Sequence, residues 1–300
     1  MDKLDISQDK KDSGQMEYKR QNKSKEIFRR FRKSKGAVIG LILSAMIVAV
    51  LILGPLFIPY EQATKQNFDN ITVSPNSEHI FGTDNYGRNV FARIIYGGRT
   101  SISIALLASV TSCIVGSILG AMAGYFGGKI DSLIMRSLDI FMSIPDILFT
   151  MAVVVALGSS FKNLVIALTI AYFTNYVRLV RSQVLSLAEQ DYVEAARAGG
   201  AGSFRIIFSH ILPNAMGVII VNVTLNIGKI IIYESTLSFL GLGMPPPAPE
   251  WGLMLSEARE FMRTAPHLLF FPAGAIVLTA CSVNLMGDGL RDALDPHLKS

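Results

Sequence analysis

The chain has 300 residues, of which 50% are hydrophobic and 17% are charged, and its mean hydropathy is +0.41. Soluble domains carry about 25% charged residues, so this composition excludes an ordinary soluble protein and indicates an integral membrane protein. The net charge of +5 is concentrated, because residues 1–36 hold 12 of the 28 Lys and Arg against 6 acids. A basic flank on the cytoplasmic side of a membrane explains this better than nucleic-acid binding does. Cys113 and Cys281 both lie in apolar runs, which excludes a disulfide framework.

Residues 1–36 form the predicted cytoplasmic basic tail. Its last part, IFRRFRKSK at 27–35, mixes aromatic and cationic residues. One interpretation is a short interfacial helix on anionic lipid. The other, which we favour, is a charge cluster that only sets topology. Gly36 to Ile58 follows as the first predicted span, since a span needs roughly 20 apolar residues, and 37–98 combines this span with an extracellular loop.

The second predicted span, Thr100 to Tyr125, is rich in small residues. Gly116 and Gly120 make a GxxxG pattern, which lets helix backbones approach closely in lipid. We therefore expect this span inside a bundle. In the loop before it, Val90 to Tyr96 combines helical periodicity with Arg93, which predicts a short amphipathic helix at the membrane interface.

Four further apolar runs complete six predicted spans. They are Leu133–Leu157, Leu164–Leu179, Asn214–Leu240 and Leu268–Met286. The predicted fold class is all-α, a polytopic membrane protein with six transmembrane helices. Residues 99–290 are the predicted core with five of these helices, and 291–300 are a cytoplasmic C-terminus.

Three acidic residues lie within the predicted spans: Asp139, Asp146 and Glu234. Ionisable groups are costly in lipid, so each is a candidate for the translocation pathway. A structural alternative stays open, in which Asp139 pairs with Arg136. Asp146 would then form a hydrogen bond at a kink beside Pro145. Glu234 is expected to face the bundle interior or the outer mouth.

The distribution of Lys and Arg predicts the topology. Six spans place both termini on one side of the membrane, which then holds 20 cations against 7 on the other side. Because cytoplasmic flanks carry an excess of Lys and Arg, both termini are predicted to be cytoplasmic, at the plasma membrane. The polar segment 194–213 lies on the same side. Arg88, Arg93 and Arg99 run against the rule on the outer side.

The sequence carries no pattern for nucleotide hydrolysis. GGKI at 127–130 approaches a phosphate-binding loop, but Ala123 stands where the first glycine is needed and Ile130 where the hydroxyl is needed. There is no HExxH, no GxSxG and no Cys/His cluster with metal-ligand spacing. We therefore expect no enzymatic activity, and energy for uphill transport must come from elsewhere.

The segment EAARAGGAGSFRIIFSHILP at 194–213 has a recognisable spacing. It resembles the EAA loop in the membrane subunits of bacterial ABC importers, where EAA is followed by Gly and later by Ile, any residue and Leu-Pro. His210 replaces that Ile, and HILPN is similar to the C-type permeases of dipeptide and oligopeptide importers. Four other segments also resemble this sub-family. They are FGTDNYGR at 81–88, LSFLGLG at 237–243, PPPAPEWGLML at 245–255 and GDGLRDALDP at 287–296. Asn89 departs from the Asp expected at that position.

The resemblance covers roughly residues 35–298 and implies the type I permease fold of ABC importers. It implies a subunit that imports di- or oligopeptides, delivered by an extracellular solute-binding protein. The implied partners are a homologous permease subunit, two cytoplasmic ATPase subunits and membrane lipid, without nucleic acid. ATP and Mg would be bound by the ATPase subunits, so no cofactor, metal or catalytic residue is expected on this chain.

In the family, this segment forms two short helices that dock on an ATPase subunit. The resemblance assigns a flat docking surface to Ala195 and Ala196, and a sharp turn between the helices to Gly200. Glu194 is expected to reach a basic or amide partner. Pro213 is expected to end the second helix and start the fifth span. The complete set of expected coupling residues is Glu194, Ala195, Ala196, Gly200, His210, Leu212 and Pro213.

Three alternatives stay open. The first is the permease of a nickel or metallophore ABC importer. The second is an ion-coupled secondary transporter that uses Asp139, Asp146, Lys229 and Glu234. The third is a membrane scaffold without transport activity. For the importer, the loops at 59–98 and 241–266 are expected to receive the binding protein, with Trp251 and the neighbouring prolines on that outer surface.

Overall fold

The architecture, given by a computed structural model, is described for residues 23–294. Within that range the regular structure is helical, apart from one isolated bridge between Thr83 and Asn89. The tail predicted over 1–36 and the C-terminus predicted over 291–300 lie partly outside the described residues.

Five helices are long and apolar enough to cross a membrane. They are α2 (Lys35–Phe57), α4 (Val90–Phe126), α7 (Phe161–Ala188), α10 (Leu212–Leu237) and α12 (His267–Leu294). The π-helical turns η2 (Ile207–Ile211) and η3 (Ser238–Leu242) extend α10 at its two ends. A sixth span results when α5 (Gly128–Met142) and α6 (Asp146–Leu157) are taken together. The predicted all-α fold with six membrane helices is confirmed.

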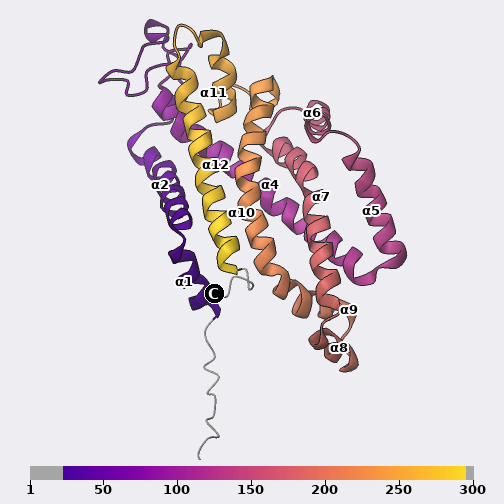
Figure 1. The fold of residues 1–300 in the computed structure, drawn as a ribbon. Coiled ribbons are helices and arrows are strands. Elements are labelled where there is room, and N and C mark those ends of the chain that lie inside the picture. The colour runs from indigo at the N-terminus through magenta and orange to yellow at the C-terminus, as the bar shows by residue number, and fades with distance from the viewer. Residues whose placement is uncertain (1–22, 295–300) are drawn as a thin grey trace, which may run out of the picture.

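The third predicted span, Leu133–Leu157, is not one continuous helix. α5 and α6 meet at 87° across residues 143–145. Pro145 explains the break, because its ring disfavours a helical conformation of the preceding residue and it has no N–H to donate. The prediction of one continuous helix over Leu133–Leu157 is therefore wrong. α6 is seen end-on at the upper right of Figure 1.

The predicted interfacial helix at Val90–Tyr96 is the beginning of α4, which continues without a break to Phe126. Asn89 caps its N-terminus, since the side chain accepts the Ala92 N–H at 3.1 Å, and Asn serves here as well as Asp. Arg93 is 0% exposed, so it lies inside the protein and not on an interfacial face. The prediction of a short amphipathic helix at the interface is wrong.

α4 and α7 form the most extensive helix pair, and glycines allow it. A Cβ atom at Gly116 would lie 2.8 Å from the Phe173 carbonyl oxygen. A Cβ atom at Gly120 would lie 2.6 Å from the Val177 carbonyl oxygen. Backbone atoms cannot give way as a side chain can, so only glycine permits this approach. The predicted packing role of the GxxxG pattern is confirmed.

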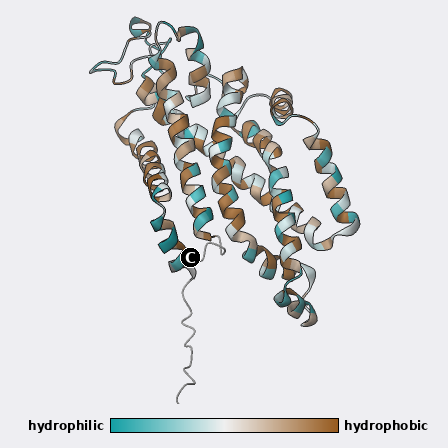
Figure 2. Cartoon of the chain, viewed as in Figure 1, coloured by the Kyte–Doolittle hydropathy of each residue, from teal (hydrophilic) through white to brown (hydrophobic). Residues whose placement is uncertain are grey.

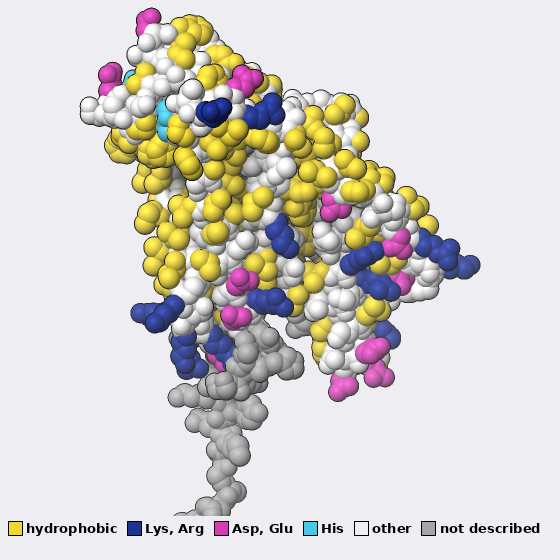
Figure 3. Space-filling model, turned by 45° about the horizontal axis from the view of Figure 1, so that its top comes forward, with side chains coloured by type: hydrophobic (Ala, Val, Ile, Leu, Met, Phe, Trp, Pro, Cys, Tyr) yellow, Lys and Arg dark blue, Asp and Glu magenta, His cyan; other side chains and the backbone are white. Residues whose placement is uncertain are grey.

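The remaining elements gather at the two ends of the bundle (Figure 1). The α8 end, as we call it, holds α1 (Lys23–Lys33), α8 (Asp191–Ala198), α9 (Ser203–Ile206) and the last turns of α12. The α11 end holds α3 (Glu61–Thr64), η1 (Phe68–Asn70), α11 (Trp251–Ala258) and η4 (Arg259–Phe261). Figure 2 shows the helices between them as mainly hydrophobic. On the face in Figure 3, most Lys and Arg side chains lie in the lower half, toward the α8 end.

α1 makes the basic and aromatic residues before the first span helical. It ends at Lys33, and the Ser34 side chain then accepts the Ala37 N–H to cap α2. Phe28 is 64% exposed. Both interpretations of this stretch remain compatible with such a helix, so its contact with lipid stays a prediction.

Candidate functional site

The connection from α7 to α10, residues 189–213, contains α8 and α9 and is here called the α8–α9 segment. α8 ends in a Schellman turn. The Ala201 N–H donates to the Ala196 carbonyl at 3.0 Å, and the Gly200 N–H donates to the Arg197 carbonyl at 3.0 Å. Such a turn needs a left-handed residue at its centre, and Gly200 has φ +81°. Gly200 therefore makes the sharp turn between the two helices, as expected.

An apolar cluster anchors the α8–α9 segment to the bundle. Val193, Ile206 and Ile211 are buried. They belong to one cluster with Val180 and Val184 of α7. Burying an aliphatic side chain of this size contributes roughly 1.5–3 kcal/mol. The segment is therefore a fixed part of the bundle and not a loose loop.

The opposite surface of the α8–α9 segment is exposed. Glu194 and Ala195 lie on it, together with three aromatic side chains. The exposed fraction is 39% for Tyr192, 71% for Phe204 and 54% for Phe208. Phe204 and Phe208 are four residues apart, so they share one face of the helix. Sequence reasoning missed these aromatic residues, although that spacing was a readable signal.

The other predicted coupling residues lie closer to the bundle. Ala196 is half-buried and packs on the apolar cluster, so it does not share the exposed surface with Ala195. The expectation of one flat surface from both alanines is corrected to Ala195 alone. Leu212 is half-buried in the same cluster. His210 is half-buried too, and its carbonyl accepts the Asn214 side-chain amide at 2.6 Å.

Pro213 does not end a helix, because residues 203–240 form one helical run. The π-helical turn η2 precedes it, and the Leu212 N–H donates to the Ile207 carbonyl, five residues back. Pro213 has no N–H to donate, and the wider turn accommodates its ring. The prediction that Pro213 terminates a helix is wrong, and the α8–α9 segment is joined to α10 by continuous helix.

The two aspartates of the third span have different surroundings. Asp139 of α5 forms an ion pair with Arg178 of α7 at 2.7 Å, so the alternative pairing with Arg136 is wrong. Asp146 begins α6 and is exposed. Its carboxylate forms no ion pair or hydrogen bond with the described residues. Its backbone carbonyl accepts a hydrogen bond from Thr150 Oγ1 at 2.7 Å. The side-chain hydrogen bond expected at the kink is absent from this part of the chain.

Glu234 of α10 is fully buried and faces the bundle interior, as expected. It contacts the equally buried carboxyl group of Glu250. Glu250 caps α11, accepting the N–H groups of Gly252 at 2.5 Å and Leu253 at 3.0 Å. Burial raises the pKa of Glu250, and two carboxyl groups in contact cannot readily both be ionised. The pair is enclosed by this chain, so a pathway role for Glu234 stays a prediction.

Trp251 does not lie on the outer surface. It is 2% exposed, and its indole N–H donates to the Ile94 carbonyl at 2.9 Å. The expectation that it meets the binding protein is wrong. The neighbouring prolines 245–247 are exposed, so that part of the predicted surface is present.

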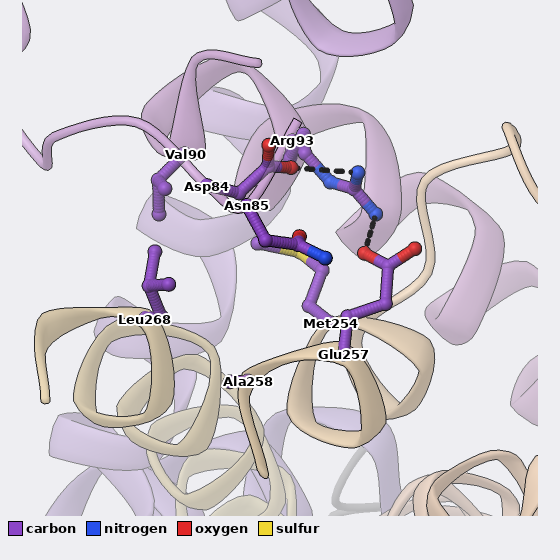
Figure 4. Close-up of a pocket in the computed structure, with 8 residues that line it drawn as sticks. All are labelled: Asp84, Asn85, Val90, Arg93, Met254, Glu257, Ala258 and Leu268. Carbon is purple, nitrogen blue, oxygen red and sulfur yellow. Dashed lines mark hydrogen bonds and ion pairs between the residues drawn. The ribbon is translucent and has the colours of Figure 1, made fainter. Parts of the chain in front are cut away.

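The α11 end holds a network of two arginines and two acids. Arg88 pairs with Asp84 at 2.7 Å and with Glu257 at 2.7 Å. Arg93 bridges the same two carboxylates at 2.9 Å each, as Figure 4 shows. Arg88 and Arg93 are 2% and 0% exposed. Two of the three outer arginines that run against the charge rule are therefore paired inside the protein.

Burial dominates the ionisation of both acids in this network. It raises the pKa of Asp84, against the opposing pull of Arg88. It raises the pKa of Glu257 to about 7, again against Arg88. Sequence reasoning missed the network, because Arg88 and Glu257 are 169 residues apart. The spacing of four residues between Asp84 and Arg88 was its only local signal.

Comparison with known proteins defines the class. Residues 116–300 match the family described as "Binding-protein-dependent transport system inner membrane component", and residues 23–75 match the "N-terminal TM domain of oligopeptide transport permease C". The chain belongs to this family of binding-protein-dependent transport components, the membrane permeases of ABC importers. It is thus a multi-pass membrane permease and not an enzyme.

Several relatives are similar over nearly the whole chain. A dipeptide transport system permease from Alkalihalophilus pseudofirmus is 44% identical, covering 92% of this chain and 90% of that protein. An oligopeptide transport system permease from Bacillus subtilis is 42% identical, with coverages of 92% and 90%. A glutathione transport system permease from Pectobacterium atrosepticum is 41% identical, with 92% of each chain covered. These similarities place the chain in the peptide branch of the family.

Proposed function

We propose that this chain is one permease subunit of an ATP-driven importer of di- or oligopeptides. The support for this cargo is the 41–44% identity to permeases named for dipeptide, oligopeptide and glutathione transport. None of these three relatives is named for a metal, and residues 23–294 hold no group of three or more metal-ligating side chains. The nickel or metallophore alternative therefore has less support. Membership of a binding-protein-dependent family argues against an ion-coupled transporter and a passive scaffold.

The exposed surface of the α8–α9 segment is the proposed docking site for a cytoplasmic ATPase subunit. The observation that carries this proposal is its combination of a buried anchor with exposed Glu194, Ala195, Phe204 and Phe208. Aromatic side chains on a polar segment are favourable when another protein covers them. ATP and Mg would bind to two such ATPase subunits and not to this chain.

The same segment offers a mechanical link. Residues 203–240 are helical throughout, so a displacement of α9 by a closing ATPase would move α10 with it. We propose that this movement alternates access to a pathway between this subunit and a homologous permease. Of the pathway candidates, Asp146 is exposed and has no ion pair among residues 23–294, whereas Asp139 is paired with Arg178 and Glu234 is enclosed.

The orientation follows from this assignment. The α8 end faces the cytoplasm, with both termini, which agrees with the excess of Lys and Arg on that side. The α11 end faces outward, where an extracellular binding protein would deliver cargo. The exposed prolines at 245–247 and the loop before α4 are the proposed contact surface.

A paired substitution tests the docking site. Ala195→Trp adds bulk to the exposed surface, so the subunit should insert normally but lose co-purification of the ATPase subunit and ATP-dependent peptide uptake. Ser77→Trp, at an exposed position of the α11 end, should leave ATPase co-purification intact. Normal co-purification and uptake with Ala195→Trp would contradict the proposed docking site.

A further inference from the structure

The break between α5 and α6 places an unusual carboxylate on this chain. Asp146 lies within the third span, yet no cationic side chain among the described residues is within ion-pair distance of it. Asp139, on the other side of the break, has Arg178 at 2.7 Å. An unpaired carboxylate within a membrane span is costly, and such residues mark pathways for polar or charged cargo. Of these two aspartates, Asp146 is therefore the one without a cationic partner among the described residues.

Two tyrosines on other helices lie near the first turn of α6. Tyr172 of α7 and Tyr233 of α10 pack edge to face, with ring centroids 5.7 Å apart. The Asp146 backbone carbonyl accepts a hydrogen bond from Thr150 Oγ1 at 2.7 Å. Thr150, one turn along α6, contacts the Tyr233 hydroxyl at 3.3 Å. Side chains of α6, α7 and α10 therefore meet one turn along α6 from Asp146, and Phe141 and Phe149 line the recess beside it.

This combination suits an ammonium group. A carboxylate supplies the opposite charge, and aromatic rings attract cations. Broken membrane helices are also where transporters commonly place substrate sites. We propose that Asp146 binds the amino-terminal ammonium group of a peptide as it passes through the membrane. This inference rests on the proposed function and adds a specificity-determining residue to it.

We expect the Asp146 site to form one wall of a larger cavity in the assembled transporter. The recess lined by Asp146, Phe141, Phe149 and Thr174 has a volume of about 10 Å³ in this chain alone, which holds about one water molecule. Cargo would therefore lie between this wall and the homologous permease. A cation supplied by that partner subunit is the competing occupant, and the experiment separates the two.

The test measures ATP-dependent uptake by the complete transporter in proteoliposomes with its binding protein. Two cargoes are compared at saturating concentration: a tripeptide with a free amino terminus and the same tripeptide N-acetylated. The ratio of the two rates is taken within each variant, so a difference in delivery by the binding protein cancels. The variants are Asp146→Asn, Asp146→Glu and, as a matched control, Asp139→Asn.

Asp146→Asn should lower uptake of the free peptide about tenfold, the equivalent of one lost pairing of about 1.4 kcal/mol, and leave the acetylated peptide unchanged. Asp146→Glu should restore the wild-type ratio, and Asp139→Asn should keep it. An equal loss for both cargoes would overturn the proposal and indicate pairing with the partner subunit. If the wild-type transporter does not import the acetylated peptide, the test uses uptake of the free peptide alone. The inference is then overturned if Asp146→Asn imports the free peptide at the wild-type rate. It is also overturned if Asp146→Glu fails to restore uptake that Asp146→Asn has lost.

The proposed function fails in a different way. A wild-type transporter that imports neither peptide with ATP would disprove peptide import itself. A wild type that imports the free peptide, with an unchanged cargo ratio and rate in Asp146→Asn, disproves only the role of Asp146.

Discussion

At the α11 end four charged side chains pair with one another in the interior, whereas at the α8 end charged and aromatic side chains are exposed. Asp84, Arg88, Arg93 and Glu257 satisfy one another inside the α11 end. At the α8 end the internal contacts are apolar, and the polar and aromatic groups are left exposed. Buried charges that pair with one another need no partner protein. An exposed aromatic surface is favourable only when another molecule covers it. The comparison indicates that this chain is completed by another protein at its α8 end.

The largest effect is expected from opening the charge network at the α11 end. Arg93→Ala removes the bridge between Asp84 and Glu257 and leaves two buried acids with one arginine. Breaking a buried pair in this way costs about 3–5 kcal/mol. We expect a large fall in the thermal unfolding temperature of the purified subunit in detergent.

Arg99→Ala is the matched control, because Arg99 lies on the same helix and is exposed. Its loss should change stability by less than about 0.5 kcal/mol. Similar unfolding temperatures for the two variants would show that the network does not hold the α11 end closed.

A smaller effect is expected at the turn of the α8–α9 segment. Gly200→Ala forces a residue with a Cβ atom into φ +81°, which costs about 1–2 kcal/mol. Among the described residues no neighbouring atom lies within 4 Å of that Cβ, so the cost comes from the backbone. We expect a local shift of α8 and less peptide carried per ATP hydrolysed, measured in proteoliposomes.

Gly199 offers the control for that variant, because its φ is −73° and an added Cβ would be 3.4 Å from the nearest atom. Gly199→Ala should leave the ratio of uptake to hydrolysis unchanged. Equal ratios for both alanine variants would argue against a conformational requirement at Gly200.

A pH effect is expected at the α11 end. Burial raises the pKa of Glu257 from an ordinary 4.5 to about 7, so the folded state holds a proton that the unfolded chain releases. The stabilisation from this group is complete below about pH 4.5 and is lost as the pH rises through about 7. The thermal unfolding temperature should therefore fall by several degrees across this window.

Glu257→Gln removes the titration while keeping the shape of the side chain. Its unfolding temperature should be flatter than that of the wild type over the same range. A wild-type curve that rises with pH in this window would mean that pairing with Arg88 and Arg93 outweighs burial.

Local patterns predicted the parts of this fold that depend on the backbone. The glycine spacing at 116 and 120 predicted close helix packing, and the glycine at 200 predicted the turn. Features that depend on contacts between distant residues were missed. Arg178 and not Arg136 pairs with Asp139, because the neighbour in space is on another helix.

Other errors arose where one residue type has two common uses. An arginine near a loop is usually exposed, but Arg93 is buried because two carboxylates meet it. Trp251 was expected on a binding surface, but the Ile94 carbonyl and the helix packing around it hold it inside. A proline after a polar segment usually ends a helix, but the π-helical turn before Pro213 accommodates it. Sequence spacing alone does not distinguish these outcomes.

Removing the exposed aromatic pair, Phe204 and Phe208, should have the smallest effect on stability. It should have the largest effect on assembly with the ATPase subunit. The double variant Phe204→Ala and Phe208→Ala removes side chains that are 71% and 54% exposed, so the isolated subunit should unfold within about 1 °C of the wild type. Co-purification of the ATPase subunit should fall at least tenfold, because buried aromatic anchors dominate interface energies. Ile206→Ala is the converse control: it removes a buried anchor and should lower stability by about 2–5 kcal/mol. A double variant that binds the ATPase normally would show that the α8 end is covered by something else, such as lipid.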